Sequence, residues 1–229
     1  FNKWFEPENI ISATRVLSSV GFRVGFIGGD RRVCCGRTYL STGMIDKAKK
    51  EAARTHALLA PYVSLGIPIV SLEPSCLFTF KDEHLSLLDN ETAADVSAHM
   101  MSIEEFIALH AKLFAPKLRP SNDCLAHGHC HQKAFSAFDP VLETLQLATE
   151  RTTPIDSSCC GMAGQFGYVP EHQQISRDMA ELSLLPSIRS ASDETKIAAS
   201  GFSCRQQIAH GTSKKALHPI RILDNALIN

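Results

Sequence analysis

The sequence predicts an α/β fold of two similar lobes, with parallel-type sheets, flanking helices and an internal pseudo-twofold duplication. Helix-type and strand-type patterns alternate along the chain, as they do in parallel α/β layers. One cysteine motif also occurs twice, which indicates a repeated unit. The 229 residues suffice for one large or two small domains. We place the boundary in PKLRPSND, so that residues 1–119 form the first lobe with its bridging helices and residues 120–229 form the second.

The first lobe is predicted to run helix, strand, loop, helix, strand, loop. PENIISATRVLSSVGF has helical periodicity, and RVGFI is typical of a strand that leads into a cysteine loop. GMIDKAKKEAARTHALLAPY predicts a long helix ending near Pro61, and IPIVSL predicts a short buried strand. Between residues 81 and 120, HLSLLDN and SIEEFIALHAKLF are interpreted as helices that bridge the lobes.

The second lobe repeats this order. DCLAHGHC predicts a strand ending at Cys130, and TKIAASGFSC predicts a strand ending at Cys204. Helices are predicted for PEHQQISRDMAELSLL and for DPVLETLQLAT, where Asp139 and Pro140 suit the N-cap and the first helical position. The segment IRIL near the end of the chain predicts a final strand or the start of a helix.

Composition excludes several classes of protein. A hydrophobic content of 44% and a charged content of 21% are typical of globular domains. The net charge of -1 provides no basic field for a phosphate backbone, so we expect no nucleic-acid partner. No apolar run reaches the ~18 residues of a membrane span. The opening FNKWFEPENI lacks the pattern of a signal peptide, so we expect a cytoplasmic location, with peripheral association with the inner membrane face left open.

Eight cysteines are unusual for this composition. A chain of this length does not depend on disulfides, and clustered thiols in a reducing compartment bind metal or do redox work. Six of the eight follow one pattern, a CCG tripeptide and a further cysteine downstream. The two sets are Cys34, Cys35 and Cys76, and Cys159, Cys160 and Cys204. Cys130 precedes the second set, and aligning the two halves would place its equivalent in the first lobe just before Phe1. Cys124 is expected to be an inert buried residue.

The cysteines of each lobe are expected to converge, because loops at the carboxyl ends of strands meet at one edge of an open α/β sheet. Thiolates select zinc or iron-sulfur clusters. Two adjacent cysteines on one zinc close a strained ring, whereas a cluster offers each sulfur a different iron. This favours an iron-sulfur cluster in the second lobe and leaves zinc open. A disulfide within a vicinal pair is strained.

Other residues near the cysteines are candidates for supporting roles. On a strand, His127, His129 and His131 would share one face and could supply ligands or form a hydrogen-bonded row. Lys133, Arg37 and Arg205 flank the cysteine loops and could stabilise an anionic group. The histidines within helix patterns are expected to have no chemical role; they are His56, His84, His110 and His172.

The segments CCGRTYLSTGM, LEPSC, HGHCHQKA, CCGMAGQFGY and SCRQQIAHGT carry a family resemblance. Across both halves the chain resembles the cysteine-rich CCG domain found twice in the heterodisulfide reductase B subunit, the glycolate oxidase iron-sulfur subunit and the anaerobic glycerol-3-phosphate dehydrogenase C subunit. The segments are most similar to the C-terminal region of large bacterial FAD and iron-sulfur D-2-hydroxyacid dehydrogenases, of the type that oxidise D-2-hydroxyglutarate or D-lactate.

The resemblance implies an iron-sulfur electron-transfer module of a flavin-linked dehydrogenase for D-2-hydroxyglutarate, D-lactate or glycolate. It implies a non-cubane [4Fe-4S] cluster bound by Cys130, Cys159, Cys160 and Cys204. FAD would be bound in a partner region, and the FAD-binding and ferredoxin-like regions would belong to the same polypeptide or to a sister subunit. The chain alone would then belong to an oxidoreductase without acting on the hydroxyacid itself.

This sequence departs from the family pattern where the relatives have C-x-x-C, because Gly201 and Glu73 replace the first cysteine. The trio Cys34, Cys35 and Cys76 is a candidate metal site for zinc, with Glu73 as a possible oxygen ligand, or it is a substrate site or a degenerate copy. Two other functions remain open. One is a zinc-stabilised subunit-docking module without redox activity, and the other is a thiol-disulfide reductase of the heterodisulfide type. We assign no catalytic residue.

Overall fold

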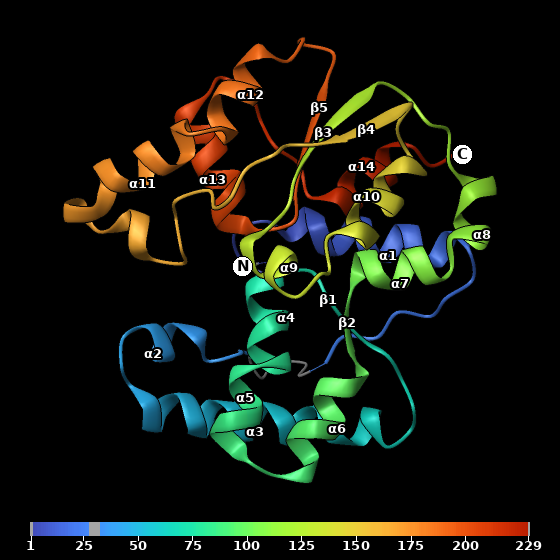
Figure 1. Ribbon diagram of the computed structural model, residues 1–229. Coiled ribbons are helices and arrows are strands. Elements are labelled where there is room, and N and C mark those ends of the chain that lie inside the picture. The colour runs from blue at the N-terminus through green and yellow to red at the C-terminus, as the bar shows by residue number, and fades with distance from the viewer. Residues whose placement is uncertain (1, 28–32, 229) are drawn as a thin grey trace. The chain divides into compact units, whose positions relative to one another are not determined.

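The computed structural model describes residues 2–27 and 33–228, which fall into two compact units (Figure 1). The small unit comprises Val24–Ser102, and the large unit comprises Phe1–Arg23 and Ile103–Asn229. These bounds differ from the predicted lobes, 1–119 and 120–229, because the first helix of the chain and the helix after residue 102 both pack in the large unit. The compact units do not test where one copy of the repeat ends and the next begins, so the boundary between residues 119 and 120 stays a prediction.

The small unit combines a two-stranded parallel sheet with helices. Strand β1 pairs with β2 in a register that places Ile69 opposite Met100. The strands are β1 Ile69–Ser71 and β2 Met100–Ser102, and the helices are α2 Arg37–Ser41, α3 Ile45–Val63, α4 Pro74–Lys81, α5 Glu83–Leu88 and α6 Glu91–His99.

Helix α3 confirms the long helix predicted from the Ala- and Lys-rich segment, and it continues past Pro61 to Val63. Its buried face includes Ala48, Ala52 and Leu59, spaced as a helix stripe requires. The predicted strand RVGFI is wrong, since residues 23–27 are irregular and Phe26 is 64% exposed. A strand needs a neighbour to satisfy its backbone groups, and the small unit's sheet pairs β1 with β2 alone among the described residues.

The large unit is built on a three-stranded parallel sheet in the order β4-β3-β5. Figure 1 shows β3 between its neighbours, with α11, α12 and α13 on one side and α1, α10 and α14 on the other. The strands are β3 Asp123–His127, β4 Arg151–Pro154 and β5 Lys196–Ala199. The α-helices are α1 Pro7–Ser19, α7 Ile103–Leu109, α8 Ala111–Phe114, α9 Cys130–Ala134, α10 Asp139–Gln146, α11 Gln173–Glu181, α12 Leu184–Ser190, α13 Phe202–Gly211 and α14 Pro219–Asn225. Short 3₁₀ turns lie at Ala115–Lys117, Phe166–Tyr168 and Pro170–His172.

The core of the large unit forms between this sheet and its helices. Fully buried side chains come from both groups of helices, including Leu145 of α10, Ile188 of α12, Ile208 of α13 and Ile220 of α14. The predicted α/β class is confirmed by these parallel sheets and flanking helices. Among the described helices, we find none whose length and apolar character would allow it to cross a bilayer.

Two predicted strands are too long at their carboxyl ends. Strand β3 stops at His127 and β5 stops at Ala199, so Cys130 and Cys204 lie on the helices that follow. A polar or glycine N-cap starts each helix, His129 before α9 and Gly201 before α13. The segment at the end of the chain forms helix α14, and the N-cap of α10 is Phe138 instead of the predicted Asp139.

Candidate metal centre

The carboxyl ends of the three strands of the large unit lead to four cysteines. Strand β3 is followed by α9, whose first residue is Cys130, and β5 is followed by α13, which carries Cys204 in its first turn. Strand β4 is followed by the loop that carries Cys159 and Cys160. Parallel strands direct such loops to one edge of the sheet, which is where ligands bind in open α/β sheets.

The four thiols form a continuous series of contacts. Hydrogen bonds join Cys130 to Cys159, Cys159 to Cys160 and Cys160 to Cys204. Cys160 and Cys204 are buried, whereas Cys130 and Cys159 are half-buried. The structure therefore brings together all four cysteines expected to converge in this lobe, and we call them the cysteine quartet.

The pKa values of the quartet shift in opposite directions along the series. Hydrogen bonds from Cys130 and Cys160 lower the pKa of Cys159 to about 2. A hydrogen bond from Cys160 lowers the pKa of Cys204 well below its usual range, against the effect of burial. Hydrogen bonds to Cys159 raise the pKa values of Cys130 and Cys160, and burial adds to both shifts. Two of the four sulfurs are thus stabilised as thiolates, the form that binds metal.

The two CCG turns share one local geometry. In each, the backbone N–H of the glycine donates to the sulfur of the first cysteine, from Gly36 to Cys34 at 3.4 Å and from Gly161 to Cys159 at 3.3 Å. Both glycines are left-handed, with φ of 74° and 86°. Residues with a Cβ rarely adopt this conformation. The duplicated motif therefore produces a duplicated turn.

Packing also restricts Gly161. A Cβ at this position would collide with the carbonyl oxygen of Ser176 in α11. The Nε2 atom of Gln207 in α13 donates to that carbonyl at 2.9 Å and to the Ser176 hydroxyl at 3.2 Å. The second CCG turn is thus held against two helices of the large unit.

The three histidines of HGHCH do not share one strand face as predicted, because the strand ends at His127. His129 caps α9 by accepting from the N–H of His131 at 3.2 Å, and His131 lies within that helix. A ring nitrogen of His127 and the sulfurs of Cys160 and Cys204 all lie within 4.8 Å of one another, and all three residues are buried. His127 therefore lies beside the two buried thiols, whereas His129 Nδ1 lies 3.9 Å from the half-buried sulfur of Cys130.

Lys133 connects α9 to the loop before the second cysteine pair. Its Nζ donates to the carbonyl oxygens of Ser157 and Ser158, the latter at 3.2 Å. Burial lowers the pKa of Lys133, while the charges of the nearby cysteines act in the opposite direction. Lys133 thus joins the helix that carries Cys130 to the loop that carries its neighbours.

The two arginines expected to stabilise an anion are paired with carboxylates instead. Arg205 is buried, forms an ion pair with Glu6 and donates to the carbonyl oxygen of Ala199 at 2.7 Å. Arg37 forms an ion pair with Glu83 at 2.6 Å. The sequence placed both near a cysteine, but these pairings give them a structural role.

The small unit brings together the cysteines of the first motif. The sulfurs of Cys35 and Cys76 lie 3.3 Å apart, and Cys34 forms a hydrogen bond with Cys35. That bond and burial raise the pKa of Cys34. For Cys35 the bond with Cys34 lowers the pKa, but Cys76 and burial outweigh it and raise the pKa to about 12. The expected oxygen donor Glu73 is buried and accepts a hydrogen bond from the Ser75 hydroxyl at 2.6 Å.

Sequence reasoning missed a buried histidine pair behind this trio. His56 Nε2 and His84 Nδ1 lie 2.9 Å apart, and His84 Nε2 is 2.7 Å from the carbonyl oxygen of Cys35. The Thr55 hydroxyl donates to the carbonyl oxygen of Cys34 at 2.9 Å. Helix periodicity could have found this support, because Thr55 and His56 fall on the buried face of α3.

The chemistry of the donors in the quartet suits a thiophilic metal group. Four sulfurs meet, two of them stabilised as thiolates, and two are buried from water. Such a set fits zinc or an iron-sulfur cluster. The trio of the small unit offers three sulfurs with no stabilised thiolate at Cys34 or Cys35. The quartet is therefore the stronger candidate.

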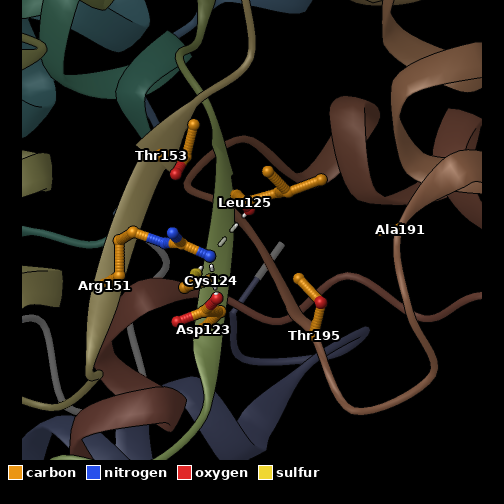
Figure 2. Close-up of a pocket in the computed structure, with 7 residues that line it drawn as sticks. All are labelled: Asp123, Cys124, Leu125, Arg151, Thr153, Ala191 and Thr195. Carbon is orange, nitrogen blue, oxygen red and sulfur yellow. Dashed lines mark hydrogen bonds and ion pairs between the residues drawn. The ribbon is translucent and has the colours of Figure 1, made fainter.

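A pocket lies elsewhere in the large unit, along the first residues of β3 and beside β4. In Figure 2 the Arg151 side chain reaches across to Asp123, with which it forms an ion pair. Cys124 is buried here as predicted, and burial raises its pKa to about 12. None of the quartet lines this pocket, whose residues are Asp123, Cys124, Leu125, Arg151, Thr153, Ala191 and Thr195.

Comparison with protein-family models finds no match for the chain. Among curated proteins, it is 28% identical over 221 residues to the anaerobic glycerol-3-phosphate dehydrogenase C subunit of Escherichia coli K12, covering 93% of this chain and 54% of that protein. It is 21% identical over 235 residues to the D-2-hydroxyglutarate dehydrogenase of Pantoea ananatis and 24% identical over 230 residues to that of Pseudomonas putida. Each of these matches covers 97% of this chain and 21% of the relative.

The chain thus spans about half the length of the first relative and about a fifth of the other two. Two of the protein groups that the motifs resemble are therefore among its relatives. Assignment to the CCG domain family stays a prediction.

Proposed function

We propose that the chain is a CCG-type electron-transfer module of a flavin-linked dehydrogenase, with an iron-sulfur cluster bound by the quartet Cys130, Cys159, Cys160 and Cys204. The observation that carries this proposal is the convergence of four sulfurs, two of them stabilised as thiolates, at the carboxyl edge of one parallel sheet. The vicinal pair favours a cluster over a single zinc ion, because neighbouring sulfurs can bind different irons. The dehydrogenase names of the relatives support a redox role.

In this function the residues of the chain bind, shield and hold the centre. A non-cubane [4Fe-4S] cluster would supply one-electron chemistry. Burial of Cys160 and Cys204 excludes water from one side, and the N–H of Gly161 donates to the Cys159 sulfur. Hydrogen bonds to ligand sulfurs and exclusion of solvent are the means by which a protein sets the potential of such a centre. Lys133 keeps two of the ligand-bearing segments together.

The rest of the electron pathway would lie outside this chain. By analogy with relatives several times longer, we propose that an FAD-binding region and a ferredoxin-like region, in the same polypeptide or a sister subunit, reduce this module. The substrate would then be a D-2-hydroxyacid or glycerol 3-phosphate, oxidised at the flavin. We also propose a cytoplasmic location for this assembly.

For the small unit we propose an incomplete copy of the same site that can bind zinc. Cys35 and Cys76 are close enough to share one ion, and Cys34 adjoins them. The raised pKa values of Cys34 and Cys35 mean that metal must displace protons from both, which weakens binding at neutral pH.

Anaerobic purification and reconstitution, followed by assays of iron, acid-labile sulfide and zinc, test the proposal. We expect about four irons and four sulfides per chain and a visible absorbance that bleaches on reduction. Cys160→Ser should lose most of the iron and the absorbance, because a central sulfur of the quartet is removed. Cys124→Ser is the matched control, since Cys124 is equally buried but lies apart from the quartet, and it should keep both.

Other results would select the alternative functions. About one zinc per chain with no iron or sulfide after reconstitution would identify a zinc-stabilised docking module. A reconstituted chain without any metal, in which one vicinal pair cycles between dithiol and disulfide, would identify a thiol-disulfide reductase. Equal iron contents in Cys160→Ser and Cys124→Ser would contradict the ligand assignment.

A further inference from the structure

We propose that His127, through its Nε2 atom, is a nitrogen ligand of the metal centre bound by the cysteine quartet. This inference rests on the proposed thiolate-bound centre and adds a fifth donor of a different element. Imidazole binds both iron and zinc. On a cluster His127 would be a fifth donor, whereas on one four-coordinate zinc ion it would take the place of one of the four thiolates.

The position of His127 places one unused donor atom at the centre. His127 is the last residue of β3, and its side chain is 1% exposed. A ring nitrogen lies with the sulfurs of Cys160 and Cys204 in a group whose members are all within 4.8 Å of one another. Its Nε2 is buried and has no hydrogen bond of good geometry among the described residues, and its nearest polar neighbour is the sulfur of Cys204, whose pKa an interaction with His127 helps to lower. A buried polar atom without a partner is costly, and a bound metal would remove that cost.

Hydrogen bonds at the other ring nitrogen favour the tautomer that binds metal. Nδ1 lies 2.9 Å from the hydroxyl oxygen of Ser157. That oxygen accepts from Lys133 Nζ at 3.4 Å, and the hydroxyl hydrogen is donated to the carbonyl oxygen of Ile155 at 3.4 Å. With its hydrogen directed at Ile155, Ser157 offers a lone pair to His127. Nδ1 then carries the proton and Nε2 the free lone pair, the arrangement found in metal-bound histidines.

The neighbouring His129 has the opposite tautomer. Its Nδ1 accepts the N–H of His131 at 3.2 Å, so in the neutral ring the proton is on Nε2. That ring also lies against Gly201, where a Cβ would collide with it. His129 thus occupies the space beside Gly201, the position at which the resembled family has a cysteine. The quartet can therefore gain a fifth donor from His127 but not from a side chain at residue 201.

As the fifth ligand of a cluster, a neutral imidazole adds no negative charge, whereas a fifth cysteine would add one. Where histidine replaces cysteine on an iron of a cluster, the reduction potential rises, because the ligand set carries less negative charge. His127 is thus expected to raise the potential of this centre relative to an all-thiolate set. Replacing it by cysteine should lower the potential.

The test uses pulsed electron paramagnetic resonance of the reconstituted chain, grown with histidine labelled by either ¹⁴N or ¹⁵N. We expect a nitrogen coupling that changes with the label in the wild-type chain, is lost in His127→Gln and is kept in the matched control His131→Gln. His127→Cys should restore a full set of iron and lower the potential. The label experiment on the wild type needs no variant, so it still shows whether a histidine binds the cluster if His127→Gln folds poorly, and loss of the coupling in His127→Cys then assigns it to His127.

Two results would overturn the inference. One is a cluster with its iron and sulfide but no histidine coupling, and the other is a coupling that persists in His127→Gln. Failure of the proposed function is distinguishable, because the reconstituted chain would then lack iron and sulfide. In that case Co²⁺ is titrated into the metal-free chain in place of iron. An absorption spectrum identical in wild type and His127→Gln would then exclude the nitrogen ligand, and a changed spectrum would support it.

Discussion

Cys124 and Cys204 are both almost completely buried, yet their pKa values move in opposite directions. Burial raises the pKa of Cys124 to about 12. The pKa of Cys204 falls because Cys160 donates a hydrogen bond to it, and the charge and hydrogen bond of His127 and the charge of His129 add to the effect against burial. Burial alone therefore does not decide whether a cysteine is a thiol or a thiolate. The donors around each sulfur make that difference.

At the same scale, the buried pair of His56 and His84 makes stability depend on pH. Burial lowers the pKa of His56 from 6.5 to about 4, and the neighbouring His84 lowers it further. As the pH falls, His56 thus binds a proton near pH 6.5 in the unfolded chain but only near pH 4 in the folded chain. The stability due to the neutral ring is complete above pH 6.5 and is lost as the pH falls through this interval.

We therefore predict that the free energy of unfolding falls less between pH 7 and pH 4.5 in His56→Gln than in the wild type, by on the order of 1 kcal/mol. Urea denaturation of the metal-free chain at several pH values measures this slope. Carboxylates elsewhere lose stability equally in both proteins and cancel in the comparison. Parallel slopes for the two proteins would show that His56 is protonated normally in the fold.

At the scale of elements, sequence patterns located the cysteine loops but not the exact ends of the strands. The strands predicted to end at Cys130 and Cys204 stop at His127 and Ala199. Alternating side chains cannot show where a strand gives way to a helix start, which depends on backbone hydrogen bonds to neighbouring strands. The prediction that His127, His129 and His131 share one strand face was wrong for this reason. The sequence patterns did not predict strands β2 and β4. Strand β2 has only 3 residues, Met100–Ser102, and β4 is a mostly exposed, polar edge strand.

The second CCG turn provides a matched pair of glycines for an element-scale prediction. Gly161 and Gly164 are both left-handed, with φ of 86° and 68°. A Cβ on Gly164 would meet nothing within 4 Å, whereas one on Gly161 would collide with the Ser176 carbonyl. Gly164→Ala should cost about 1–2 kcal/mol of stability from backbone strain alone.

Gly161→Ala should cost more than this and should also reduce metal content, because the turn must move away from α11. Chemical denaturation and iron analysis of both variants measure the two effects. Similar losses in the two variants would mean that contact with Ser176 does not hold the turn.

At the scale of the whole molecule, the compact units are not the two halves of the predicted repeat, whose boundary stays a prediction. The large unit is discontinuous, since its first segment precedes the small unit in sequence and its second follows it. Helix α1 packs on α14, and the Ser12 hydroxyl donates to Asp224 at 2.9 Å. Local patterns predicted α1 and left IRIL open as a strand or a helix start. They could not show this pairing, because such contacts join residues more than 200 positions apart.

The ion pair between Glu6 and Arg205 makes this long-range connection testable. The Arg205 side chain is 4% exposed and that of Glu6 is 18% exposed. Removal of one charge from a buried pair leaves the other without compensation. Glu6→Gln should therefore lower the free energy of unfolding by about 3 kcal/mol, measured by urea denaturation.

Glu181→Gln is the matched control, because its ion pair with Arg189 joins two side chains that are each nearly half exposed. Solvent screens such a pair, so this variant should show little or no change in stability. If the two variants lost equal stability, the N-terminal segment would not depend on Arg205 for its place in the large unit. A loss confined to Glu6→Gln would show that the segment before the small unit is integral to the fold that carries the cysteine quartet, because Arg205 is the residue next to Cys204 in α13.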